Sequence, residues 1–152
     1  MIVNIFSYFC RVTVVNPDQM LAGSFYDILS FSSTLTERSG QELVAVCRLN
    51  PGHSIFTGHF PGNPVVPGVC QVQMVKELVE KTLEKQVRLT ESDNIKFLSM
   101  ISPETTPLLE FRIISRPGEE GVISVTATIV SGSTVFLKFK GKFEIERLWQ
   151  KS

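Results

Sequence analysis

The sequence lacks three features: an excess of charge of one sign, a long apolar run and a regular spacing of cysteines. Lysine plus arginine and aspartate plus glutamate each number 15 in the 152 residues, so no overall basic charge favours nucleic acid as a partner. The longest apolar stretch, residues 1–10, is much shorter than the ~20 residues that span a bilayer. We therefore expect neither a nucleic-acid-binding protein nor a membrane span.

The chain has only three cysteines, Cys10, Cys47 and Cys70, and no C-x-x-C pair. An odd number without this spacing argues against a disulfide framework and against a structural zinc site. The N-terminus also lacks the basic segment and the small-residue cleavage site of a secretory signal. We interpret the sequence as that of a cytoplasmic protein with reduced thiols.

A length of 152 residues with 43% hydrophobic residues is typical of one folded domain with its own core. A turn signal at residues 16–19 separates the first part of the chain from the rest. We predict a peripheral N-terminal extension over residues 1–19 and one domain over residues 20–152. We also hypothesise that Met20 is the natural start.

Hydrophobic periodicity divides this domain into strands and one long helix. Apolar and β-forming residues alternate along a buried strand over residues 41–49. Residues 69–86 contain good helix formers and no glycine or proline, and their first three turns are apolar nearly all round, as in a helix buried on most sides. Four further strands are expected as antiparallel neighbours, over residues 94–101, 108–115, 122–130 and 134–146. The sequence therefore predicts an α+β domain whose antiparallel sheet curls around one central helix.

The segment between the first strand and the helix, residues 56–69, carries the candidate chemistry. It contains three prolines and three glycines in 14 positions, so the backbone around His59 is rigid and holds the imidazole in a defined place. The helix that follows begins with backbone N–H groups that are expected to be free donors, near Gly68, Val69 and Cys70. Such donors suit a carbonyl oxygen that gains negative charge, and a histidine facing them is suited to act as a general base.

The pattern G-H-F-P-G-x-P-x-x-P-G-V ahead of a buried helix resembles the FabZ-like 3-hydroxyacyl-[acyl-carrier-protein] dehydratase family of fatty-acid synthesis. The resemblance covers residues 25–146 and implies the hot-dog fold. It also implies a homodimer, or a larger assembly, in which the motif histidine of one chain faces an acidic helix residue of the other. His59 matches that histidine, which removes the proton α to the thioester in the family's reaction. The helix N-terminus, here Gly68 and Val69, stabilises the carbonyl oxygen.

The same resemblance implies a substrate and a partner. The family acts on 3-hydroxyacyl thioesters that are carried on the phosphopantetheine arm of an acyl carrier protein, and the reaction needs no metal or redox cofactor. Because the carrier protein is acidic, basic residues near the tunnel mouth are its expected contacts. The candidates in this chain are Lys81, Lys85, Arg88 and Lys96.

The sequence departs from the family at the second catalytic position. Fourteen residues after the histidine, where the family has glutamate or aspartate, this chain has Gln73. Four residues later, where the dehydratases commonly have glutamine, it has Glu77. An amide cannot donate a catalytic proton, and the two positions differ by ~6 Å along a helix axis. We hypothesise a dehydratase in which Gln73 orients the hydroxyl or a water molecule and Glu77 supplies acidity indirectly.

The sequence leaves alternatives open. Gln73, Glu77, Glu80 and Glu84 share one face of the helix and could simply form a solvated stripe. A hot-dog thioesterase would use a buried Glu77 to activate water, or Cys70 as a covalent nucleophile. The absence of an acid at position 73 also fits a non-catalytic subunit that binds acyl carrier protein.

Overall fold

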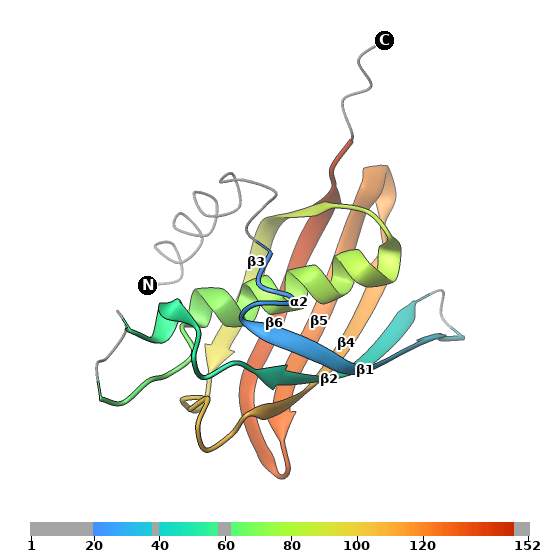
Figure 1. Ribbon diagram of the computed structural model, residues 1–152. Helices are drawn as coiled ribbons and strands as arrows, with labels where there is room; N and C mark the ends of the chain where they lie inside the picture. The colour runs from blue at the N-terminus through green and yellow to red at the C-terminus, as the bar shows by residue number, and fades with distance from the viewer. Residues whose placement is uncertain (1–19, 38–39, 58–61, 148–152) are drawn as a thin grey trace.

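The computed structural model describes residues 20–37, 40–57 and 62–147 of the chain (Figure 1). Its strands are β1 (Tyr26–Leu35), β2 (Gln41–Leu49), β3 (Val87–Phe97), β4 (Leu108–Pro117), β5 (Val122–Ser131) and β6 (Thr134–Ile145). The long helix is α2 (Gly68–Leu83), and the two short 3-10 helices are η1 (Ser54–Thr57) and η2 (Glu119–Gly121).

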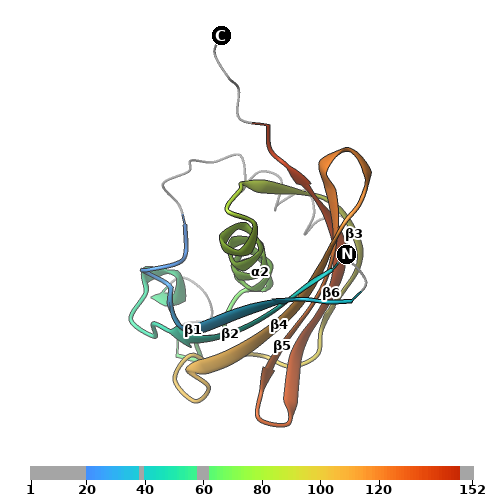
Figure 2. The ribbon, with the colours of Figure 1, turned by 90° about the vertical axis from the view of Figure 1, so that its right-hand side faces the viewer.

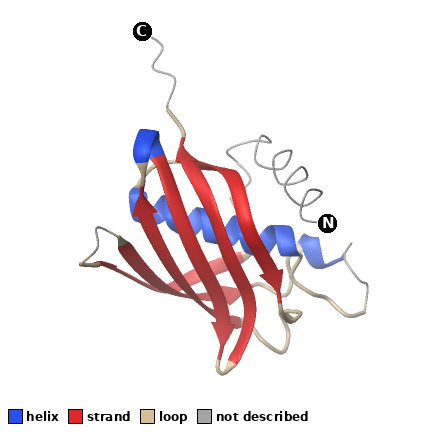
Figure 3. Cartoon of the chain, turned by 180° about the vertical axis from the view of Figure 1, so that it is seen from behind, coloured by secondary structure: helices blue, strands red, loops and turns tan. Residues whose placement is uncertain are grey.

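The six strands form one antiparallel sheet in the order β1-β2-β4-β5-β6-β3. In the view along the helix, this sheet curls around α2 (Figure 2). In the view from behind, the outer face of the sheet is turned to the reader and the helix lies on its far side (Figure 3). This is the hot-dog fold, so the prediction of a curled antiparallel sheet around one central helix is confirmed.

Helix α2 begins where the rigid loop ends. Pro67 caps it with an extended conformation (φ −59°, ψ 144°), and Gly68 is the first helical residue. The predicted end at residue 86 is wrong: the helix stops at Leu83 because Glu84 has a left-handed φ of 54°, which an α-helix cannot continue. Strand β3 therefore begins at Val87 and not at the predicted residue 94. No helix in the described ranges is long and apolar enough to cross a membrane.

The strand order also corrects the prediction that the four strands expected after the helix are neighbours in chain order. Strands β4, β5 and β6 are antiparallel neighbours as expected, but β3 pairs with β6, and β4 pairs with β2. Because β3 forms one edge of the sheet, the connection over residues 98–107 spans the width of β5 and β6 to reach β4. The sequence of β1 has no regular pattern of apolar residues, because most of its side chains are exposed. Its pairing with β2 also shifts in register between Ile28 and Ser30.

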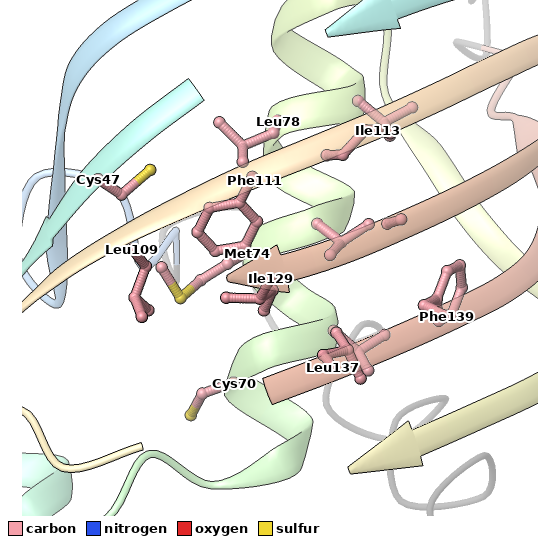
Figure 4. Close-up of a cluster of buried hydrophobic side chains, with 14 of the residues drawn as sticks. Cys47, Cys70, Met74, Leu78, Leu109, Phe111, Ile113, Ile129, Leu137 and Phe139 are labelled. Carbon is pink, nitrogen blue, oxygen red and sulfur yellow. The ribbon is translucent and has the colours of Figure 1, made fainter. Parts of the chain in front are cut away.

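The core lies between α2 and the inner face of the sheet. The predicted alternation in β2 is confirmed, with Leu43, Ala45, Cys47 and Leu49 all buried. Side chains of α2, among them Met74 and Leu78, lie against Phe111, Ile129 and Leu137 of the central strands (Figure 4). This packing fixes the helix against the inner face of the curled sheet, and it thereby defines the position of each helix residue.

Gly141 of β6 permits a close approach of β3, so substitution of this glycine should have a large effect on stability. A Cβ at Gly141 would stand 2.6 Å from the backbone oxygen of Glu91 and 2.8 Å from the ring of Phe139. Because a backbone atom cannot yield as a flexible side chain can, Gly141→Ala should lower the free energy of unfolding by ~1–3 kcal/mol. Urea unfolding measures this, with the exposed neighbour Lys140→Ala as the control. A Gly141→Ala variant as stable as this control would contradict the described β3–β6 pairing.

Candidate active site

The loop before α2 is described on both sides of the candidate base. His59 itself lies outside the described residues, within 58–61, so its catalytic role stays a prediction. Before this gap, Phe56 is buried in the core. After it, Gly62 has a φ of +88°, a left-handed conformation that side chains disfavour. The local structure is therefore defined up to Thr57 and from Gly62 onward, and the rigidity of the backbone at His59 stays a prediction.

The N-terminus of α2 presents two backbone donors and not the expected three. The Cys70 N–H donates to the Pro67 carbonyl at 3.0 Å, so the expectation that it is free is wrong. The N–H groups of Gly68 and Val69 donate no hydrogen bond to any residue within the described ranges. A Cβ at Gly68 would stand 2.7 Å from the tip of the exposed Phe97 ring, so a larger residue there would require this ring to move. The two donors can stabilise an oxygen that gains negative charge.

Glu77 is the centre of a buried polar network. The residue is only 4% exposed, so the solvated-stripe interpretation is wrong for it. Its carboxylate accepts four hydrogen bonds, from the backbone N–H groups of Leu21 (3.1 Å) and Ala22 (2.8 Å), the Tyr26 hydroxyl (3.4 Å) and the Gln73 side-chain amide (3.1 Å). Each oxygen accepts two of the four, so Glu77 in this arrangement has no free lone pair to offer a substrate.

Two side-chain amide oxygens on α2 are buried without a hydrogen-bond donor in the described part of the chain. They are the Oε1 atoms of Gln71 and Gln73. Gln71 donates its amide N–H to the Val66 carbonyl at 3.3 Å. Sequence reasoning placed Gln73 in the site but missed Gln71 and Tyr26. A polar residue in an apolar first turn was a signal for Gln71, whereas nothing in the sequence brings Tyr26 to Glu77.

The electrostatics of Glu77 reflect two opposed effects. Burial is the larger, and it raises the pKa of the carboxyl above its ordinary value. The hydrogen bonds from Ala22, Leu21, Gln73 and Tyr26 favour the charged form and oppose this rise.

The raised pKa predicts a pH-dependent stability that Glu77→Gln should remove. The folded chain holds this proton at pH values where the unfolded chain has already released it, so it loses stability as the pH rises through that range. Urea unfolding from the ordinary carboxyl pKa upward should show a steeper decline for the wild type than for Glu77→Gln. Burial also raises the pKa of Glu80, so this residue contributes to the pH dependence of both proteins, and the charge of Glu77 adds a smaller part to that rise in the wild type alone. Equal slopes for the two proteins would contradict the assignment.

Cys70 is poorly suited to act as a nucleophile. Burial, together with the nearby charge of Glu77, raises the pKa of its thiol to about 11, so the reactive thiolate is scarce at neutral pH. Cys47 is fully buried, and burial raises the pKa of its thiol to about 12. The covalent thioesterase alternative therefore loses its candidate nucleophile.

The described residues also contain no group of three histidine, cysteine, aspartate or glutamate side chains that could hold a metal ion.

The four basic candidates for carrier-protein contact differ in their surroundings. Lys81 lies over the ring of Phe31, with its Nζ 5.4 Å from the ring centroid. Arg88 pairs with a glutamate of β6 at 3.6 Å. Lys85 and Lys96 are exposed and form no ion pair with any residue that the structure describes. These two lysines are thus the most available to an acidic partner.

Comparison with protein families agrees with the motif. A family model described as ApeI-like, ApeI dehydratase, matches residues 35–134. The 3-hydroxyacyl-[acyl-carrier-protein] dehydratase FabZ of Caulobacter sp. (strain K31) is 32% identical over 108 residues, which are 68% of this chain and 60% of that protein. FabZ of Wolbachia pipientis wMel is 29% identical over 110 residues, 60% of this chain and 77% of that protein. The match thus spans about 60% of the length of the first of these relatives, and the similarity inferred from the motif is confirmed.

Solved structures agree with the fold. An uncharacterised protein from Erwinia carotovora subsp. atroseptica superposes with a TM-score of 0.62 at 23% identity and covers 82% of this chain and 98% of its own. The dehydratase heterocomplex ApeI:P from Xenorhabdus doucetiae has a TM-score of 0.55 at 18% identity, with 78% and 96% coverage. A protein described as a putative thioesterase, yhdA from Lactococcus lactis, has a TM-score of 0.57 at 11% identity, with 86% and 97% coverage. At these identities the similarity extends to the fold alone.

Proposed function

Because the chain belongs to the ApeI-like dehydratase family, we propose that it dehydrates 3-hydroxyacyl thioesters on an acyl carrier protein to trans-2-enoyl thioesters. The observation that carries the proposal is the family match over residues 35–134, which spans the His59 loop and the start of α2. The N–H groups of Gly68 and Val69, which have no acceptor within the described ranges, support it, because they suit the thioester oxygen of an enolate-like transition state.

In the proposed reaction each group has a distinct task. His59 removes the proton α to the thioester carbonyl, and the N–H groups of Gly68 and Val69 stabilise the negative charge that develops on the carbonyl oxygen. The C3–O bond then breaks, and the hydroxyl takes up the proton that His59 has removed, directly or through a water molecule, and leaves as water. Gln73 orients this hydroxyl or a water molecule, and Glu77 acts indirectly, through Gln73. No step needs a metal or redox cofactor.

The proposal includes the partner, the assembly and the compartment. The acyl carrier protein delivers the substrate, and exposed basic residues such as Lys85 and Lys96 are its proposed contacts. Two copies of the chain form a homodimer, or a larger assembly, that completes each site. The cytoplasm is the proposed compartment, in line with the free cysteines Cys47 and Cys70 among the described residues.

A second candidate function follows from Gln73. An amide at this position cannot donate a proton, so the chain would then be a non-catalytic subunit that binds acyl carrier protein and pairs with an active relative. A buried Glu77 was expected to activate water in a thioesterase. Its four hydrogen bonds argue against this role, because they leave the carboxylate no free lone pair to accept a proton from water.

The test is incubation of the purified chain with a short 3-hydroxyacyl-acyl carrier protein, followed by mass spectrometry of the carrier. Loss of one water from the acyl group, with the thioester intact, is the expected result. Release of the free acid would identify a thioesterase. An unchanged substrate that still binds the chain would identify the non-catalytic subunit.

A further inference from the structure

The turn 21–26 connects the two halves of the proposed site. Its Phe25 is fully buried and stacks on Phe56, in the segment that leads into the loop of the candidate base, with ring centroids 5.3 Å apart. The backbone N–H of Asn50 donates to the Phe25 carbonyl at 2.9 Å. On its other side, the turn gives two backbone N–H groups to Glu77 of α2. Glu77 therefore holds the turn 21–26 against the helix, and the same turn supports the start of the loop.

Glu77 also determines how the amide of Gln73 is oriented. The Gln73 Nε2 donates to a carboxylate oxygen of Glu77 at 3.1 Å, so the other end of the amide, Oε1, is turned away from the carboxylate. The reverse orientation would bring two acceptor oxygens together, which is unfavourable. Oε1 is buried and has no donor in the described part of the chain. A buried acceptor without a partner is costly, so this atom is available for a ligand that donates a hydrogen bond.

We propose that Glu77 is a positioning residue that acts through Gln73: it holds the amide in one orientation, so that Oε1 accepts a hydrogen bond from the hydroxyl group of the substrate. This inference rests on the proposed function, because it takes the hydroxyl from a 3-hydroxyacyl chain. It also defines a specificity. An acceptor at this place favours an acyl chain with a 3-hydroxyl over a saturated chain, which has no donor, and over a 3-oxo chain, which presents a second acceptor.

The test compares the binding of two unreactive ligands and does not depend on turnover. Both are acyl-pantetheine analogues in which nitrogen replaces the thioester sulfur, and they differ only in the presence of the 3-hydroxyl. Calorimetry should give the wild type a Kd about tenfold lower for the hydroxylated ligand, the value of one hydrogen bond to a buried acceptor. Gln73→Leu should bring the ratio of the two Kd values to about one.

Glu77→Gln separates positioning from a merely structural role. An amide at position 77 can accept or donate, so Gln73 is free to turn over and the ratio should fall to about threefold or less. A merely structural residue would change both Kd values by the same factor and leave the ratio unaltered. The exchange variant Gln73→Glu/Glu77→Gln again places an acceptor at position 73 held by a donor at position 77, and should restore the ratio. Glu84→Gln, exposed at the end of the same helix, is the matched control and should keep the wild-type ratio.

The outcomes distinguish this inference from the dehydratase proposal. A tenfold wild-type ratio that falls in Gln73→Leu and Glu77→Gln supports the inference, even in a chain that performs no dehydration. Equal binding of the two ligands by the wild type would overturn it, even in a chain that dehydrates its substrate. A ratio retained in Glu77→Gln would overturn the positioning role of Glu77.

Discussion

Replacing His59 with alanine is expected to slow the dehydration of a short 3-hydroxyacyl-acyl carrier protein by ~10²–10⁴-fold, the usual contribution of a general base. The N–H groups of Gly68 and Val69 belong to the backbone and stay in place, so binding of the thioester should change little. The loss should therefore be in kcat and not in KM. A continuous assay of enoyl thioester formation measures both.

The chain offers a matched control for this variant. His53 is the only other histidine, and its Nδ1 accepts a hydrogen bond from the backbone N–H of Ile55 at 3.1 Å. His53→Ala should keep most of the activity. If His59→Ala dehydrated the substrate as fast as His53→Ala, then the histidine of the motif would not be the base.

Replacing Glu77 with leucine is expected to lower the free energy of unfolding by about 3 kcal/mol or more. Leucine is of similar size and leaves no large cavity, but it accepts no hydrogen bond. The donors from Leu21, Ala22, Tyr26 and Gln73 would then be buried without an acceptor, at a cost of roughly 1–3 kcal/mol for each that finds no water. Urea unfolding measures the change through its midpoint.

The charge-neutral variant provides the comparison. Glu77→Gln keeps one acceptor oxygen, which still serves two of the four donors, so it should cost less than Glu77→Leu, about 2 kcal/mol. Glu84→Gln should stay within about 0.5 kcal/mol of the wild type. If Glu77→Leu proved as stable as Glu77→Gln, then the carboxylate would not be what holds the turn 21–26 to the helix.

The fold could be predicted from the sequence where the period of the side chains is strong. The apolar residues of α2 and the alternation in β2 predicted the central helix and a sheet around it. The pairing of β3 with β6 could not be predicted, because hydrophobic periodicity shows which face of a strand is buried but not which strand lies beside it. The early end of the helix depends on the backbone conformation of Glu84, a residue that is itself compatible with a helix.

The candidate site was predictable only in part. The motif around His59 and the position of Gln73 could be recognised because their spacing along the chain is specific. The role of Glu77 depends on contacts with Leu21 and Tyr26, which are more than 50 residues away in the sequence. Its burial could not be deduced from helical spacing either, since a carboxylate on that face is equally compatible with a solvated stripe.

The most direct test of the dehydratase activity uses an enoyl-acyl carrier protein that is incubated with the chain in water labelled with a heavy isotope of oxygen. The measurement is the position at which the labelled oxygen enters the product. A dehydratase catalyses the reverse hydration, so it is expected to place the label in the 3-hydroxyl group of an intact thioester. Mass spectrometry of the carrier and of the released acids locates the label. Heavy oxygen in the carboxylate of a free acid, with none at C3, would contradict the dehydratase assignment and identify a thioesterase.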